Sequence, residues 1–201
     1  KNIFIHPAMG DDGLSMGAVL SYLGDEHKFS PSRFKNVFLG PEYENDTILK
    51  EIENKNLSYK YYDDIEKEIA TLLSKGFIVA RFSGKMEYGP RALGNRSILY
   101  QTTDITVNDW LNKKLQRTEF MPFAPATLYD YANNCYENIK GAEYAAEFMT
   151  IAFRCTPYMK EKSPAVVHCD NTARPQFVKK ESNPQFYTIL KEYFKLTRIP
   201  S

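Results

Sequence analysis

The sequence predicts a mixed α/β domain, and three observations support that class. An apolar run at residues 77–80, directly after Gly76, is typical of a buried strand. Apolar residues at helical spacing in the segments 65–73 and 186–194 indicate amphipathic helices that pack on a core. The chain has 201 residues, of which 43% are hydrophobic and 14% aromatic, so it can bury the core of one domain.

The charge balance limits the kinds of partner. The net charge is +1, with cations and anions interspersed along the chain. Bulk electrostatics therefore favour neither nucleic acid nor an acidic membrane as a partner, and any anion site must be local. Cys135, Cys155 and Cys169 have no close metal-ligand spacing, which indicates free thiols in a cytoplasmic protein. No apolar stretch approaches 18 residues, and no signal peptide is visible.

The N-terminal segment predicts a strand followed by a helix. Residues 2–6 alternate in the manner of a strand, and residues 14–23 have helical spacing, with Gly24 as the stop. Asp11 and Asp12 fall at or just before the start of this helix. Their position alone favours a helix cap, which aspartate provides well. The alternative is a metal ligand, because a carboxylate is a hard oxygen donor.

The later elements are predicted from the same patterns, strand alternation and helical spacing. Asp63 and Asp64 precede one helix, and Asn183 and Pro184 precede another, as capping residues and first-turn proline do. We expect Trp110 in the core, within the apolar stripe of its helix. The expected helices are 46–55, 65–75, a helix beginning at Asp104 and a helix after Pro184. The expected strands are 58–62, 77–82, 97–100, 148–155 and an apolar strand leading into His168.

Residues 81–97 form the most distinctive stretch, with three glycines, one proline, four cations and one carboxylate. Glycine allows a positive φ or a close approach of the backbone to a ligand, and proline stiffens a turn. We expect the four cations to converge on an anion, with Glu87 orienting an arginine or accepting from a hydroxyl. The less favoured alternative is a solvated turn with scattered charge. The cations are Arg81, Lys85, Arg91 and Arg96, the glycines are Gly84, Gly89 and Gly94, and the proline is Pro90.

A second polar cluster lies at residues 168–174. Alternation along a regular strand would place His168, Asp170, Thr172 and Arg174 on one face. Asp170 followed by Asn171 also suggests a hydrogen-bonded turn, with an internal pair between Asp170 and Arg174. The residues alone leave these two interpretations about equal.

The stretch GKMEYGPRALGNRSI at residues 84–98 resembles the signature of the O-carbamoyltransferase family of nodulation-factor and antibiotic biosynthesis. Residues 6–18 and the cluster at 168–174, with Asn171 in place of a glycine, resemble further motifs of that family. The family joins an N-terminal actin-like ATPase domain to a C-terminal YrdC-like domain. The resemblance implies that residues 1–40 are a β–α remnant of the actin-like carbamoyl-transfer domain. Residues 41–201 would then be a YrdC-like twisted open sheet with flanking helices, truncated at its C-terminus.

The implied function is the C-terminal part of an ATP-dependent O-carbamoyltransferase. Such a domain forms carbamoyl-adenylate from carbamoyl phosphate and ATP, with Mg²⁺, and the missing actin-like domain transfers the carbamoyl group to a hydroxyl of a sugar or small molecule. The fragment alone is expected to be inactive. By resemblance, Asp11 would join two upstream histidines around a divalent metal, for which iron is a candidate, so that site would be incomplete. The implied catalytic residues are Lys85, Arg91 and Arg117, and the implied binding residues are Gly84, Glu87, Gly89, Arg96, Ser97, His168, Asp170, Thr172 and Arg174.

Three positions depart from the family pattern. Leu115, Thr118 and Met121 stand where the family has lysine, glutamate and arginine. Losing one charge-assisted bond to carbamoyl phosphate would cost about 1.5–3 kcal/mol. Either other cations (Lys113, Lys114 and Arg117) are recruited, or this copy uses another donor or has lost transfer activity. The alternative function is therefore a divergent nucleotide-binding module without transfer activity. A third class, an RNA-binding domain, conflicts with the charge balance.

Overall fold

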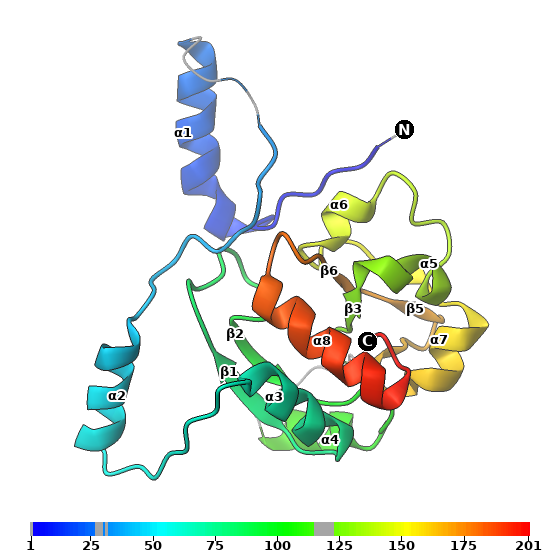
Figure 1. Cartoon of the computed structure of the whole chain (residues 1–201). Helices are drawn as coiled ribbons and strands as arrows, with labels where there is room; N and C mark the ends of the chain where they lie inside the picture. Colours follow the sequence, from blue (N-terminus) through cyan, green and yellow to red (C-terminus); the bar gives the residue numbers. More distant parts are fainter. Residues whose placement is uncertain (1, 27–29, 31, 115–122) are drawn as a thin grey trace.

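The mixed α/β class is confirmed by the computed structural model, which describes residues 2–26, 30, 32–114 and 123–201 (Figure 1). Short strands lie among helices of very different length. The helices are α1 (Leu14–Asp25), α2 (Asn45–Asn54), α3 (Ile65–Ser74), α4 (Val107–Lys114), α5 (Ala132–Cys135), α6 (Glu143–Ala146), α7 (Pro157–Lys162) and α8 (Pro184–Thr197). The strands are β1 (Val79–Phe82), β2 (Arg96–Leu99), β3 (Ala126–Leu128), β4 (Phe153–Arg154), β5 (Thr172–Ala173) and β6 (Gln176–Val178). Short 3-10 turns lie at η1 (Asp11–Gly13), η2 (Tyr129–Tyr131) and η3 (Pro164–Val166).

The strands of the described ranges pair in twos. β1 and β2 are antiparallel, β4 and β5 are antiparallel, and β3 and β6 are parallel. Three short ladders therefore stand where a single open sheet was expected. Phe82 at the end of β1 lies opposite Arg96 at the start of β2. This register makes residues 83–95, which we call the β1–β2 loop, the connection of a long hairpin.

The main core lies between α3 and α8. The Asn183 side chain caps α8 by accepting from the Phe186 N–H at 3.1 Å, and Pro184 is the first helical residue, as predicted. Asp64 caps α3 in the same way. Because both helices have one apolar face, they bury it against each other and against β3 and β6. The buried members of this core are Ile69, Ala70, Leu73, Leu128, Val178, Phe186, Ile189, Leu190, Tyr193 and Ile199.

A second core lies beneath α5 and α7. The Phe153 and Phe177 rings stack with centroids 5.7 Å apart, and Tyr136 packs beside them. Cys135 and Cys155 are buried in this core as free thiols. Burial raises the pKa of Cys135 to about 12 and that of Cys155 to about 11. Neither thiol is therefore a nucleophile near neutral pH.

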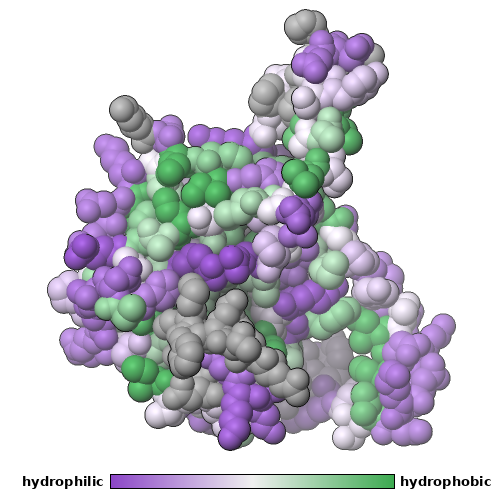
Figure 2. Space-filling model, turned by 180° about the vertical axis from the view of Figure 1, so that it is seen from behind, coloured by the Kyte–Doolittle hydropathy of each residue, from purple (hydrophilic) through white to green (hydrophobic). Residues whose placement is uncertain are grey.

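Two helices project from the body. Figure 1 shows α1 and α2 standing away from the packed part of the chain, and neither contains a buried residue. Figure 2 shows an apolar side on α2 toward the body of the molecule. Ile48 and Ile52 of α2 line a groove there together with Leu57 and Phe82. None of the described helices combines the length and apolar composition needed to span a bilayer.

Several predicted strands are wrong. Residues 2–6 and 58–62 have no regular secondary structure and belong to none of the ladders in the described ranges. The expected strand at 148–155 is reduced to β4, since Met149 has a φ of +54° that interrupts the extended backbone. A 3-10 turn that begins at Pro164 replaces the apolar strand expected before His168.

Two burial predictions are also wrong. The Phe77 side chain before β1 is 56% exposed, so β1 does not start from a buried run. Trp110 is 50% exposed on α4 rather than part of the core. Both side chains are about half exposed, so neither belongs to a buried core of the described residues.

Candidate functional site

Close backbone approaches shape the β1–β2 loop. Gly89 and Gly94 have φ angles of +97° and +110°, which disfavour any other residue. A Cβ at Gly94 would come within 2.5 Å of the Phe186 ring on α8, and one at Gly89 within 2.9 Å of the Pro7 carbonyl oxygen. The glycines therefore let the loop pack tightly against both α8 and the N-terminal segment.

A buried carboxylate holds the loop together from within. Glu87 is only 7% exposed. Its Oε1 atom accepts hydrogen bonds from the backbone N–H groups of Leu93 at 2.9 Å, Asn95 at 2.7 Å and Arg96 at 3.0 Å. Instead of orienting an arginine side chain, as one interpretation of the sequence had it, Glu87 binds the backbone of its own loop.

Arg81 joins the loop to the start of α8. Its guanidinium donates to the Gly94 carbonyl, to Asn95 Oδ1 at 3.0 Å and to Gln185 Oε1 at 3.1 Å. Asn95 Oδ1 also accepts from Asn183 Nδ2 at 2.9 Å, so Arg81 and the residue that caps α8 share one acceptor in the loop. Burial lowers the pKa of Arg81 from its ordinary value, and nearby carboxylates act in the opposite direction.

Arg96 is engaged by carbonyl groups of the loop. It donates to the Ser83 carbonyl at 2.9 Å and the Gly84 carbonyl at 2.9 Å, and it lies 3.7 Å above the Phe82 ring centroid. Ser97, another predicted binding residue, accepts from the Gly94 N–H through its hydroxyl at 2.9 Å. Arg81 and Arg96 thus donate to groups of the loop and of α8, and the convergence of the four cations on an anion stays a prediction.

The side chains of Lys85 and Arg91 make no hydrogen bond to the loop within the described part of the chain. Lys85 is exposed and lines a cleft of about 520 Å³ beside the N-terminus of α8. The Nε atom of Arg91 is buried and has no hydrogen-bond partner among the described residues. The cleft is lined by Asn36, Phe38, Glu42, Lys85, Asn95, Ser182, Asn183, Pro184 and Gln185.

The cluster at residues 168–174 is a turn, so the turn interpretation of the sequence is correct. Asn171 has a φ of +65°, and Asp170 Oδ1 accepts from the Thr172 N–H at 3.0 Å and the Thr172 hydroxyl at 2.7 Å. These bonds lower the pKa of Asp170. His168 Nδ1 lies 3.0 Å from the Thr172 hydroxyl. The hydrogen bonds that define the turn thus run to Thr172 rather than from Asp170 to Arg174.

Gln176 connects this second segment to the loop. It follows Arg174 by two residues, and its Nε2 donates to the Leu93 carbonyl at 2.9 Å. Its Oε1 is buried and has no partner among the described residues. Sequence reasoning did not select Gln176, Asn95 or Gln185. Their uncharged side chains carry no pattern of their own, and only their placement beside the loop makes them relevant.

Asp11 lies in the exposed turn η1, next to the loop. The Tyr88 hydroxyl donates to the Asp12 carbonyl at 3.3 Å. Neither η1 nor α1 has a side-chain cap, so the capping interpretation is wrong. Over the described ranges, no group of three or more histidine, cysteine or acidic side chains could hold a metal ion. Arg117 and the departures at positions 115, 118 and 121 lie outside the described residues.

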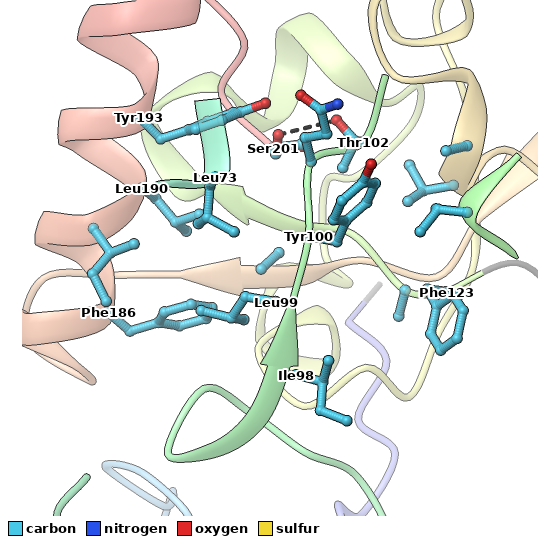
Figure 3. Close-up of a pocket in the computed structure, with 17 residues that line it drawn as sticks. Leu73, Ile98, Leu99, Tyr100, Thr102, Phe123, Phe186, Leu190, Tyr193 and Ser201 are labelled. Carbon is cyan, nitrogen blue, oxygen red and sulfur yellow. Dashed lines mark hydrogen bonds between the residues drawn. The ribbon is translucent and has the colours of Figure 1, made fainter. Parts of the chain in front are cut away.

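A small apolar pocket of about 100 Å³ lies between β2, α3 and α8 (Figure 3). Leu73, Leu99 and Leu190 contribute to its walls. At one end the Thr102 hydroxyl donates to the Ser201 carbonyl at 3.1 Å. The apolar lining suits a ring or an aliphatic group and offers no charge for an anion.

Comparison with known proteins identifies the family. The description "Carbamoyltransferase C-terminus" belongs to the family profile that matches residues 70–201. An uncharacterised protein of Methanocaldococcus jannaschii is 36% identical over 98% of this chain and 33% of its own length. Nodulation protein U of Rhizobium tropici is 33% identical over 98% of this chain and 32% of its own length. Nodulation protein NolO of Bradyrhizobium diazoefficiens is 31% identical over 99% of this chain and 37% of its own length.

The chain therefore belongs to the carbamoyltransferase C-terminal family, and the resemblance drawn from the sequence is confirmed. It spans about a third of the length of the curated relatives that it matches.

Proposed function

We propose that this chain is the carbamoyl-adenylate-forming part of an ATP-dependent O-carbamoyltransferase. Membership of the family supports the reaction class. The observation that carries the proposal is that the β1–β2 loop is held by its own hydrogen bonds, while Lys85 is exposed at the cleft and the Arg91 Nε has no hydrogen-bond partner among the described residues. A rigid loop of this kind suits substrates with phosphate groups, because little ordering remains to be done on binding.

The chemistry asked of these residues is binding and charge neutralisation. Hydrolysis of carbamoyl phosphate releases phosphate and leaves carbamate. A carbamate oxygen then bonds to the α-phosphorus of ATP as the bond to pyrophosphate breaks, so negative charge accumulates on the pyrophosphate. The Lys85 ammonium at the cleft would offset that charge, and we assign the Arg91 guanidinium of the same loop to the same task. Asn95 and Gln185 line the same cleft and would bind uncharged oxygens. Mg²⁺, bound through phosphate oxygens, would supply further neutralisation.

The remaining assignments extend this proposal. The carbamoyl group would pass to a hydroxyl of a sugar or small molecule on an actin-like domain that precedes residue 41 and includes residues 1–40. The reactants are metabolites of the cytoplasm, so we place the activity there. A single exposed carboxylate at Asp11 does not make a metal site by itself, and no step is assigned to a metal at that position.

Substitution of Arg91 tests the proposal. In the full-length protein, Arg91→Ala should reduce ATP–pyrophosphate exchange by about a hundredfold, because the charge-assisted bonds of one guanidinium are worth about 1.5–3 kcal/mol. Arg91→Lys keeps the charge without the planar fork and should retain part of the rate. Lys191→Ala removes an exposed cation from α8 and serves as the control. Exchange at the wild-type rate in Arg91→Ala, with Lys191→Ala also unchanged, would overturn the role.

A second function, nucleotide binding without transfer, is favoured by Leu115 and Met121, which lack the charges of the family pattern. Isothermal titration of the full-length protein distinguishes the two. Binding of ATP with no response to carbamoyl phosphate supports the binding module. Binding of both ligands supports the carbamoyltransferase.

A further inference from the structure

The β1–β2 loop contains an anion of its own. One oxygen of the Glu87 carboxylate accepts three backbone N–H groups, from Leu93, Asn95 and Arg96, at 2.7–3.0 Å. Among the residues that the structure describes, no lysine or arginine lies within ion-pair distance of Glu87. Backbone N–H groups that converge in this way form a nest that binds anions in many proteins. In this loop a side chain of the same loop fills the nest.

The occupied nest determines how substrate can bind. Leu93, Asn95 and Arg96 donate to Glu87, and the intervening Gly94 N–H donates to Ser97. Four consecutive backbone donors are therefore already used. A phosphate that reached the loop could not use these four N–H groups, in contrast to glycine-rich loops that hold phosphate with their amides.

Glu87 also closes the segment that carries Arg91. The carboxylate comes before Arg91 in the chain, and the N–H groups that it binds come after Arg91. The bonds thus fix both ends of a short arc that contains Gly89, where the backbone touches Pro7. Release of either end would leave Arg91 without a defined position.

We propose that Glu87 is a positioning residue, an internal anion whose carboxylate fixes the loop and so holds Arg91 in place for the substrate. The inference rests on the proposed function for the identity of that substrate. The role of the carboxylate as an internal anion can be tested without it.

The test removes the carboxylate and supplies a substitute. Glu87→Ala leaves a space lined by three N–H donors, which formate should enter. Glu143 also accepts a backbone N–H, from Gly141 at 2.6 Å, but far from the loop in sequence. Glu143→Ala is therefore the matched control. Sodium chloride at equal ionic strength controls for screening.

Three results are expected from the full-length protein. Formate should raise the melting temperature of Glu87→Ala more than chloride does and should leave that of Glu143→Ala unchanged. Crystals of Glu87→Ala should show Arg91 displaced without formate and restored with it. The kcat/KM of ATP–pyrophosphate exchange should fall by about a hundredfold in Glu87→Ala and recover at least tenfold with formate. If the alanine variant does not fold, Glu87→Gln keeps the acceptor oxygen and should show a smaller defect in the same measurements.

The outcomes separate the two proposals. Stabilisation by formate with Arg91 unmoved and exchange not restored would reduce Glu87 to a structural residue and overturn the inference. Equal responses of Glu143→Ala and Glu87→Ala to formate would also overturn it. Absence of exchange in the wild type would refute the proposed function alone, because formate binding and the position of Arg91 are read independently of activity.

Discussion

Cations of the same sequence motif have different roles according to their hydrogen bonds. Arg96 donates to the carbonyls of Ser83 and Gly84 and covers the Phe82 ring. Arg91 lies in the preceding β1–β2 loop and keeps a buried Nε atom without a hydrogen-bond partner among the described residues. The sequence cannot separate such residues, because the carbonyl groups that engage Arg96 are backbone atoms of positions with no distinctive side chain.

The role of Arg96 yields a prediction about stability. Arg96→Lys should lower the free energy of unfolding by about 1 kcal/mol, because an ammonium cannot reach both carbonyls with the fork of a guanidinium and leaves a part-buried acceptor unpaired. Urea denaturation followed by circular dichroism measures the difference. Arg154→Lys, at an exposed position of β4, is the control and should be neutral. Equal stability of the two variants would show that Arg96 does not hold the loop.

The amide side chain of Asn183 connects helix α8 to the β1–β2 loop. Asn183 caps α8 through its Oδ1 and donates from its Nδ2 to Asn95 in the β1–β2 loop. The cap was predictable from the sequence, since asparagine before proline is a common start of a helix. The bond to Asn95 was not, because it joins positions 88 residues apart.

Removal of the cap should therefore affect the loop as well as the helix. Asn183→Ala should cost about 1–2 kcal/mol of stability and also increase hydrogen exchange at the backbone N–H groups of residues 93–96. Asp64→Ala removes the comparable cap of α3, from the Lys67 N–H at 3.2 Å, and should leave exchange in the loop unchanged. Faster loop exchange in both variants would indicate general destabilisation instead.

Over the whole molecule, sequence patterns predicted the parts that depend on local periodicity. α3 and α8 were found because their apolar faces repeat every three or four residues, and the long hairpin loop because of its glycines. The arrangement of the strands was missed, since a pattern at residues 58–62 cannot reveal whether another strand lies beside it. Trp110 was misplaced for the same reason, as burial depends on what packs against a face.

The distribution of tyrosines predicts how the folded chain responds to alkali. Burial raises the pKa of Tyr136 and Tyr193 above the ordinary value of 10.0. A hydrogen bond to Asp130 raises the pKa of Tyr187 to about 12. In the unfolded chain these phenols ionise near pH 10, whereas the folded chain retains their protons. Stability should therefore be intact below pH 10 and fall as the pH rises toward 12.

Denaturation midpoints measured across this range test the expectation, together with phenolate absorbance in folded and urea-unfolded protein. Tyr187→Phe removes one late-titrating phenol and should flatten the loss of stability. Phenolate titration curves that coincide for folded and unfolded protein would contradict the assignment.

The contact between the N-terminal turn and the β1–β2 loop has a mechanical consequence. Gly89 touches the Pro7 carbonyl, and Tyr88 bonds to the Asp12 carbonyl and packs its ring against His6. Helix α1 extends outward directly from this turn (Figure 1). A displacement of α1 would therefore move residues 7–12 and, through these contacts, the part of the loop that carries Arg91.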